Sequence, residues 1–164
     1  TTMSMTPFID KVKLTITRII EENEALLKKI KSSGTFQFAI VDYRDHEGGG
    51  DYVFRQLPFT DHRTAIEYVK KLTNVGNSDT QEAVLDGLDA ACDLKWRDKA
   101  DHLLFHVLDA PPHGKMYGAY KDDRWPGGCP CGKTAEGVLT KMKKKNIRYH
   151  VLRCTNALNM MVQE

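Results

Sequence analysis

The chain has 164 residues, which at roughly 150 residues per domain is enough for one domain and excludes a multidomain enzyme. Lys and Arg number 24 against 22 Asp and Glu, and 41% of the residues are hydrophobic, as in an ordinary globular domain. The average conceals a gradient, because residues 32–131 contain 11 basic and 16 acidic side chains, whereas residues 132–153 contain seven Lys or Arg and one acid, Glu136. Because basic and acidic residues nearly balance over the whole chain, the composition does not imply a strongly basic or acidic partner.

The ends of the sequence and its cysteines indicate the cellular compartment of the protein. No apolar run approaches the ~18–20 residues of a membrane span, and residues 1–6 lack the basic-then-apolar pattern of a signal peptide. Four unevenly spaced cysteines are too few for a disulfide framework, so we expect a cytoplasmic protein without a membrane span. A helical pattern begins soon after Thr1 and another begins at Asn156, so we expect a single domain, residues 1–164, cut at both ends from a longer protein.

The first third of the chain predicts one helix and two strands. Apolar residues recur at steps of three and four over residues 8–30, which indicates an amphipathic helix that ends at Gly34. Residues 35–41 and 51–57 are rich in β-branched and aromatic side chains, which is typical of strands. The Gly48–Gly50 run between them predicts an antiparallel hairpin.

The remaining elements alternate between helices and strands. Thr60 or Asp61 is expected to cap a short helix, and Asp79 with Glu82 resembles the capping box of the next helix. Residues 102–108 are almost wholly apolar, which is typical of a strand in a parallel sheet whose two faces are both covered. After a loop over residues 110–132, we predict a helix over residues 134–145 and a strand over residues 147–152. This alternation predicts an α/β fold with a mainly parallel sheet.

Small oxygen ligands lie in the loops where such a fold binds ligands. Thr2 and Ser4 precede the first helix, Thr80 precedes a middle helix, and Asp109 ends the buried strand. Binding sites of open α/β sheets lie outside the carboxyl ends of the strands, and hydroxyl and carboxylate oxygens suit Mg²⁺. Each of these residues alone is better explained as an ordinary helix cap, so the metal hypothesis depends on their joint order.

Because these oxygen ligands occur in this order along the chain, the chain resembles a von Willebrand factor type A domain. The metal-ion-dependent adhesion site of this family has Asp-x-Thr/Ser-x-Ser after the first strand, a Thr in a Gly-containing loop and an Asp ending the fourth strand. The chain has Thr2-Met3-Ser4, the loop 76–80 and Val107-Leu108-Asp109 in these places. The stretches DTQEAVLDGLDAA (79–91) and LDAPPHG (108–114) are similar to the intracellular type A domains found beside alpha-kinase catalytic domains.

The resemblance implies a doubly wound, mainly parallel, Rossmann-like sheet flanked by helices. The central first strand and the leading Asp of the family would precede Thr1, so this chain lacks both. The implied function is a noncatalytic interaction domain, in which Mg²⁺ or Mn²⁺ binds an acidic group of a partner protein. Its metal ligands would be Thr2, Ser4, Thr80 and Asp109. The alternative is the regulatory part of an atypical alpha-type serine/threonine protein kinase, whose catalytic domain lies outside this chain.

Residues 127–134 (GGCPCGKT) match the P-loop expression G-x-x-x-x-G-K-[ST], with Gly132, Lys133 and Thr134 as phosphate-binding candidates. A true P-loop follows a buried strand, which the polar segment 119–126 does not provide. Bare matches to such expressions are frequently false. We therefore rank nucleotide binding below metal binding.

His113, Cys129 and Cys131, with Cys154 as a further candidate, carry the imidazole and thiolate groups that Zn²⁺ prefers. Paired cysteines of structural zinc sites are usually two to four residues apart, so Cys-Pro-Cys is cramped. Free thiols in the loop are the simpler interpretation, and a zinc site remains the alternative.

The basic run from Lys141 to Arg148 is the one segment that could suggest nucleic acid. It is short, it lies at the end of a predicted helix, where cations are favourable, and few aromatic residues interrupt it. We therefore expect a solvated helix face and no nucleic-acid partner.

Overall fold

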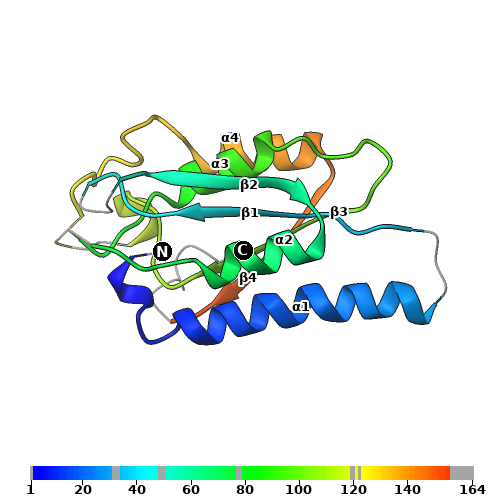
Figure 1. Cartoon of the computed structure of the whole chain (residues 1–164). Helices are drawn as coiled ribbons and strands as arrows, with labels where there is room; N and C mark the ends of the chain where they lie inside the picture. Colours follow the sequence, from blue (N-terminus) through cyan, green and yellow to red (C-terminus); the bar gives the residue numbers. More distant parts are fainter. Residues whose placement is uncertain are drawn as a thin grey trace.

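The chain contains both helices and strands. The computed structural model describes residues 2–30, 34–47, 51–76, 79–118, 121 and 123–155. In chain order its elements are η1 (Met3–Met5), α1 (Ile9–Lys29), β1 (Phe38–Tyr43), β2 (Phe54–Thr60), α2 (His62–Lys70), α3 (Val84–Asp93), β3 (His102–Leu108), η2 (Lys115–Tyr117), α4 (Ala135–Lys144) and β4 (Ile147–Arg153) (Figure 1). In the sequence, β1 is next to β2 and α2 is next to α3.

The strands form two pairs of opposite type. β1 and β2 are antiparallel, with Tyr43 opposite Phe54, and β3 and β4 are parallel through seven consecutive residue pairs. The antiparallel pairing and the α/β class are confirmed, although β1 and β2 each begin three residues later than predicted. Among the described residues the strands form two-stranded sheets, one of which is parallel. The predicted glycine turn at Gly48–Gly50 and the helical pattern from Asn156 lie outside the described residues.

Two of the helix caps follow the local sequence. The Asp61 carboxylate accepts hydrogen bonds from the backbone N–H groups of Arg63 and Thr64 at 2.8 and 3.1 Å, and so caps α2. The Thr134 hydroxyl accepts from the Gly137 N–H at 3.1 Å and caps α4. Both caps satisfy N–H groups that lack partners in the first helical turn. None of the described helices combines the length and the apolar character needed to cross a membrane.

The predicted capping box at Asp79 and Glu82 is wrong. Helix α3 begins at Val84, after Ala83, and has no side-chain cap. Asp79 instead accepts a hydrogen bond from the backbone N–H of Arg124 at 2.9 Å, and Glu82 accepts one from the hydroxyl of Thr2. Asp79 and Glu82 therefore bind residues that are far away in the sequence, and neither carboxylate caps the helix as the local pattern predicted.

Helix α3 lies at the centre of the main hydrophobic core. Every residue from Val84 to Cys92 is buried, and α3 packs against β1 and α4, whereas α1 packs against α2. Figure 1 shows α3 and α4 on one side of strands β1 and β2, and α1 and α2 on the other. The buried residues of this core are Val84, Leu85, Leu88, Ala91, Cys92, Leu104, Leu108, Val138, Met142 and Ile147.

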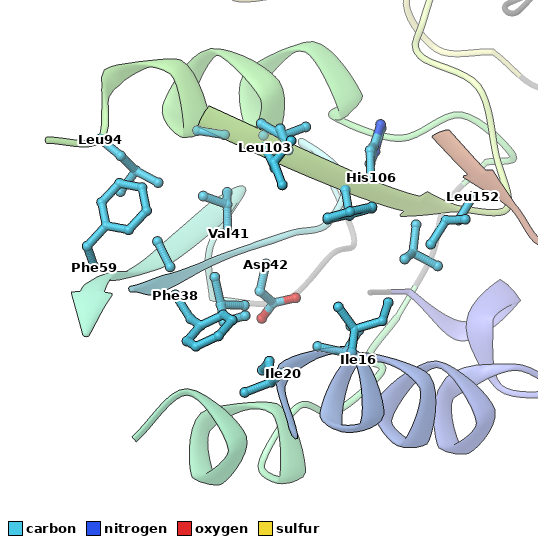
Figure 2. Close-up of a pocket in the computed structure, with 18 of the residues that line it drawn as sticks. Ile16, Ile20, Phe38, Val41, Asp42, Phe59, Leu94, Leu103, His106 and Leu152 are labelled. Carbon is cyan, nitrogen blue, oxygen red and sulfur yellow. The ribbon is translucent and has the colours of Figure 1, made fainter. Parts of the chain in front are cut away.

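Strand β3 is covered on one face only, contrary to the prediction. Leu104, His106 and Leu108 are buried, whereas Leu103 and Phe105 are 39% and 48% exposed. These two exposed side chains line a cavity of about 780 Å³ that β1, β3 and α1 enclose. In Figure 2, Val41 of β1, Leu103 of β3 and Ile16 of α1 surround this mainly apolar space.

A chain of hydrogen bonds connects the two strand pairs beneath α3. The Tyr43 hydroxyl is 2.7 Å from His106 Nε2, and His106 Nδ1 is 2.7 Å from the Tyr149 hydroxyl. Burial lowers the pKa of His106 to about 3, so the ring is neutral and has one donor and one acceptor nitrogen. His106 is therefore a hydrogen-bonded sheet residue.

We predict that Gly87→Ala destabilises the protein, because a Cβ at Gly87 would lie 2.5 Å from the Tyr43 ring. Alanine normally stabilises a helix by about 1 kcal/mol relative to glycine, but the overlap should outweigh this gain and cost about 1–3 kcal/mol. Chemical denaturation measures the difference. Gly127→Ala is the control, because a Cβ there meets no atom within 4 Å. Equal or greater stability of Gly87→Ala would disprove the close packing of α3 on β1.

Candidate functional site

Buried acidic side chains gather where the chain leaves β1 and β3 and enters α3. Asp and Glu are seldom fully buried without partners, so this concentration calls for compensating charge. The buried carboxylates in this region are those of Asp45, Asp79, Glu82, Asp86 and Asp109. Three groups of contacts organise them.

The first group contains two of the predicted metal ligands. Thr2 is buried, and its hydroxyl lies 3.1 Å from that of Ser4 and donates to the Glu82 carboxylate. The backbone N–H of Glu82 donates to the Pro111 carbonyl at 3.1 Å, which fixes this segment beside the loop that follows β3. Thr2 and Ser4 therefore lie side by side, and Glu82 is an additional member of this group that the motif did not identify.

The Glu82 carboxyl group is in an unfavourable environment for its charge. Burial raises its pKa to about 8, and the charges of Asp45 and Asp109 act in the same direction. Its Oε2 atom is buried and has no hydrogen-bond partner among the described residues. At neutral pH this group therefore needs either a proton or a nearby cation.

The other two predicted ligands flank this group. Asp109 is buried directly after β3 and lines the same cavity as Thr2 and Glu82. Thr80 is half-buried, two residues before Glu82, but does not line that cavity. The structure thus places Thr2 against Glu82, Ser4 beside Thr2, and Asp109 in the same cavity. Metal binding by these residues remains a prediction.

The second group is centred on His113. Its Nε2 is 2.8 Å from an Asp45 oxygen, and its Nδ1 is 2.9 Å from an Asp123 oxygen. Asp123 also accepts hydrogen bonds from the backbone N–H groups of Gly114 and Trp125, each at 2.9 Å. Because both ring nitrogens face carboxylates, each acts as a donor and the ring is an imidazolium.

The pKa values of this group are consistent with ion pairing. Burial alone would lower the pKa of His113, but the hydrogen bonds to Asp45 and Asp123 raise it on balance. Burial would likewise raise the pKa values of both carboxyl groups, but the bond to His113 and nearby backbone N–H groups lower them. His113 therefore anchors the loop that follows β3, and both of its nitrogens are engaged.

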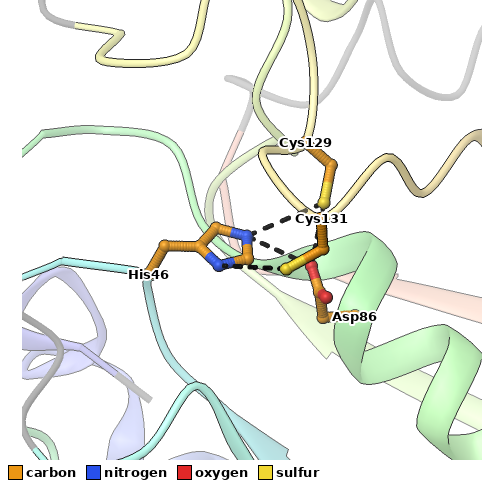
Figure 3. A group of neighbouring side chains, drawn as sticks. All are labelled: His46, Asp86, Cys129 and Cys131. Carbon is orange, nitrogen blue, oxygen red and sulfur yellow. Dashed lines mark hydrogen bonds and ion pairs between the residues drawn. The ribbon is translucent and has the colours of Figure 1, made fainter.

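The third group brings the two loop cysteines together with a different histidine. Cys129 Sγ lies 3.1 Å from Asp86 Oδ2 and 3.7 Å from His46 Nε2, and Cys131 Sγ lies 3.9 Å from His46 Nδ1 (Figure 3). Burial and the neighbouring Asp86 raise the pKa of the Cys129 thiol to about 11. The predicted zinc set thus divides, because His113 belongs to the second group and Cys154 follows β4.

His46 and Asp86 were not singled out by sequence reasoning. His46 lies three residues beyond the end of β1, and Asp86 lies in the first turn of α3. The position of His46 just beyond a strand was the available signal, since ligand sites collect at the carboxyl ends of strands. Nothing in the local pattern of Asp86 distinguishes it from an ordinary acid in a first helical turn.

The P-loop candidates have structural partners. Lys133 forms an ion pair with Asp89, the Thr134 hydroxyl caps α4, and Gly132 adopts a positive φ of 70° in the preceding turn. The described residues from 123 to 134 form bends and turns and contain no strand. This geometry lacks the strand that a P-loop needs and gives nucleotide binding no support.

We predict that His113→Leu destabilises the protein by about 3–5 kcal/mol, because removing one partner of a buried ion pair leaves uncompensated charge. The raised pKa of His113 stabilises the fold fully below 6.5, and this contribution is lost as the pH rises through its folded pKa. The lowered pKa values of Asp45 and Asp123 stabilise the fold above 3.8, and their contribution is lost as the pH falls through the folded values.

The difference in unfolding free energy between wild type and His113→Leu should therefore be largest between pH 3.8 and 6.5. Urea unfolding across the pH range measures it. His62→Leu is the control, since His62 lies 3.7 Å from Glu24 in a more exposed pair, worth about 0–1 kcal/mol. A small, pH-independent difference for His113→Leu would contradict the buried imidazolium.

Comparison with known proteins identifies one kinase relative. No protein-family model matches the chain. The alpha-protein kinase vwkA of Dictyostelium discoideum is 30% identical over 152 residues, which cover 91% of this chain and 23% of that protein. The chain thus spans about a quarter of the length of this curated relative, and over most of its own length it is similar to part of an alpha-protein kinase.

Proposed function

We propose that the chain is a noncatalytic type A interaction domain that binds an acidic group of a partner protein through Mg²⁺ or Mn²⁺. The observation that carries this proposal is the environment of Glu82, a buried carboxylate with an unpartnered oxygen, beside Thr2 and close to Asp109. A hard divalent cation prefers such oxygen ligands. A cation at this position would neutralise the Glu82 carboxylate, which otherwise needs a proton at neutral pH.

The donor set fits this ion. Thr2, Ser4 and Thr80 would supply hydroxyl oxygens and Asp109 a carboxylate, directly or through water. Glu82, through its contact with Thr2, would hold that hydroxyl in place and add negative charge to the site. The bound ion would offer a coordination position to a carboxylate of the partner. The side chains of this chain would orient the ion, and no covalent chemistry is required of them.

We also propose that the complete domain has a doubly wound sheet with a central strand between β1 and β3. The cavity there is lined by all of β1 and all of β3, while β2 and β4 pair with these two strands. An inserted strand would bury Leu103 and Phe105 and join the two pairs into one sheet. Chain preceding Thr2 would supply this strand, since Thr2 lines the same cavity.

The place of the domain in a larger protein is the second part of the proposal. The similarity to an alpha-protein kinase supports a regulatory role beside an alpha-type serine/threonine kinase domain outside residues 1–164. The four cysteines are free thiols, which supports a reducing compartment such as the cytoplasm. Because Lys133 is engaged by Asp89, we do not propose nucleotide binding.

We predict that Asp109→Asn and Glu82→Gln each weaken Mg²⁺ binding by at least about tenfold, because each removes a negative charge from the site. Isothermal titration calorimetry of the purified protein measures the affinity. Asp10→Asn is the matched control, since Asp10 is an exposed acid on α1. Equal heats for wild type and both site variants would contradict the metal assignment.

The pH dependence of the Mg²⁺ affinity gives the calorimetric titration a second readout. Mg²⁺ must displace a proton from Glu82 below its folded pKa of about 8, so the affinity should rise with pH by up to roughly tenfold per unit and level off near that value. In Glu82→Gln this dependence should disappear. A wild-type affinity that is constant from pH 6 to 8 would exclude Glu82 from the site.

We further predict that the strands beside the cavity gain protection in a longer protein that includes the sequence before Thr1. Amide hydrogens of β1 and β3 that face the cavity should exchange more slowly by at least about tenfold, because a paired strand would bind them. Mass spectrometry of hydrogen exchange compares the two proteins. Amides within α4, which are already hydrogen-bonded, are the control, and unchanged rates in β1 and β3 would contradict strand insertion.

A further inference from the structure

We infer that His46, Asp86, Cys129 and Cys131 form a Zn²⁺ site that fastens the 123–131 loop to the start of α3. This site is separate from the proposed Mg²⁺ site and shares no ligand with it. It also differs from the zinc set expected from the sequence, because the imidazole comes from His46 and a carboxylate completes the four ligands. Thiolates, imidazole nitrogens and carboxylate oxygens all bind Zn²⁺, which is almost always four-coordinate and tetrahedral in structural sites.

Three of the ligand atoms lie close to the spacing of a zinc shell. Zn–S bonds are about 2.3 Å and Zn–N and Zn–O bonds about 2.0–2.2 Å, so neighbouring ligand atoms of a tetrahedron lie about 3.3–3.8 Å apart. Cys129 Sγ is 3.7 Å from His46 Nε2 and 3.1 Å from Asp86 Oδ2, and His46 Nε2 is 3.1 Å from the same Asp86 oxygen. These atoms require only small shifts to accommodate the ion.

Cys131 supplies the fourth corner. Ligand atoms of all four residues lie within 4.8 Å of one another, and Figure 3 shows both sulfur atoms directed toward the His46 ring. Cys131 is exposed, whereas His46 and Asp86 have side chains that are only 7% and 5% exposed. The buried pair thus forms a fixed base, and the exposed thiol can rotate onto an ion that enters from solvent.

The backbone explains how a single-residue spacer can place two thiols on one side. The Gly132 N–H donates to the Cys129 carbonyl at 3.0 Å, which closes a turn over Cys129-Pro130-Cys131-Gly132. Pro130 occupies the second position, where its fixed φ favours a turn. Gly128 and Gly132 have φ values of 122° and 70°, which favour glycine. The spacing that is cramped in an extended chain is therefore suitable in this turn.

Surrounding contacts hold the imidazole in position. The His46 ring packs edge-on against Trp125, with 5.4 Å between ring centroids. Its backbone N–H donates to Asp45 at 2.6 Å, and Asp45 also pairs with His113. Such outer contacts orient a metal ligand and restrict its motion. The His113 network therefore supports the zinc site without supplying a ligand to it.

The identity of the ion follows from the ligand atoms. Two sulfurs and one imidazole nitrogen are soft or borderline ligands that favour Zn²⁺ over Mg²⁺. The Cys129 thiol donates to Asp86, and both thiols would bind Zn²⁺ as thiolates. Binding of one Zn²⁺ thus releases the thiol protons to solvent and leaves the oxidation states unchanged.

The test is to load the purified protein with Zn²⁺, dialyse it, and measure the bound metal by mass spectrometry. We expect one Zn²⁺ per chain. Co²⁺ in its place should give a sulfur-to-cobalt charge-transfer band and the absorption of a tetrahedral ion. Competition with a chromophoric chelator should show that Cys131→Ser and His46→Gln lower the Zn²⁺ affinity by more than about tenfold.

The controls separate metal binding from folding. Cys154→Ser and His62→Gln alter the same residue types outside the cluster and should keep wild-type affinity. Cys131 is exposed, so Cys131→Ser should retain the wild-type circular dichroism. No retained zinc, no charge-transfer band, or wild-type affinity in Cys131→Ser would overturn the inference. The Mg²⁺ titration of the other site is independent of each of these results.

Discussion

Compensation of buried negative charge is the constraint on which this end of the molecule depends. Asp45, Asp79, Glu82, Asp86 and Asp109 are withdrawn from water where the loops after β1 and β3 meet the start of α3. Part of the balance comes from the protein, because His113 pairs with Asp45 and Asp123. Glu82 and Asp86 lie in separate groups, and each combines a buried carboxylate with further metal ligands. We therefore interpret the region as a pair of cation sites built around one internal imidazolium.

The two proposed ions would have different tasks. Mg²⁺ beside Glu82 would lie at the end of the cavity and present a coordination position to a partner, whereas Zn²⁺ at Cys129 and Cys131 would hold a loop. The short segment from Asp79 to Asp86 contributes to all three groups of contacts. The two proposed sites thus meet at the start of α3.

Sequence reasoning succeeded where the determinants are local. The predicted cap at Asp61 involves residues two and three positions away, and the apolar run 102–108 coincides with β3. It failed where distant residues compete for a side chain, because Thr2 takes Glu82 from 80 positions away. His46 and Asp86 are 40 positions apart, and Cys129 lies 83 positions from His46 and 43 positions from Asp86. Spacing alone could not identify that group, nor the exposure of Leu103, which depends on what lies between β1 and β3.

The most direct test of this account is the unfolding free energy of the metal-free protein with Mg²⁺, with Zn²⁺ and with both ions. An ion that binds only the folded state stabilises it by RT ln(1 + [L]/Kd). Because the two sites share no ligand, the account predicts that each ion raises the unfolding free energy and that the increments add within about 0.5 kcal/mol. Unchanged stability with either ion, or mutual exclusion of the two, would contradict the presence of two separate cation sites.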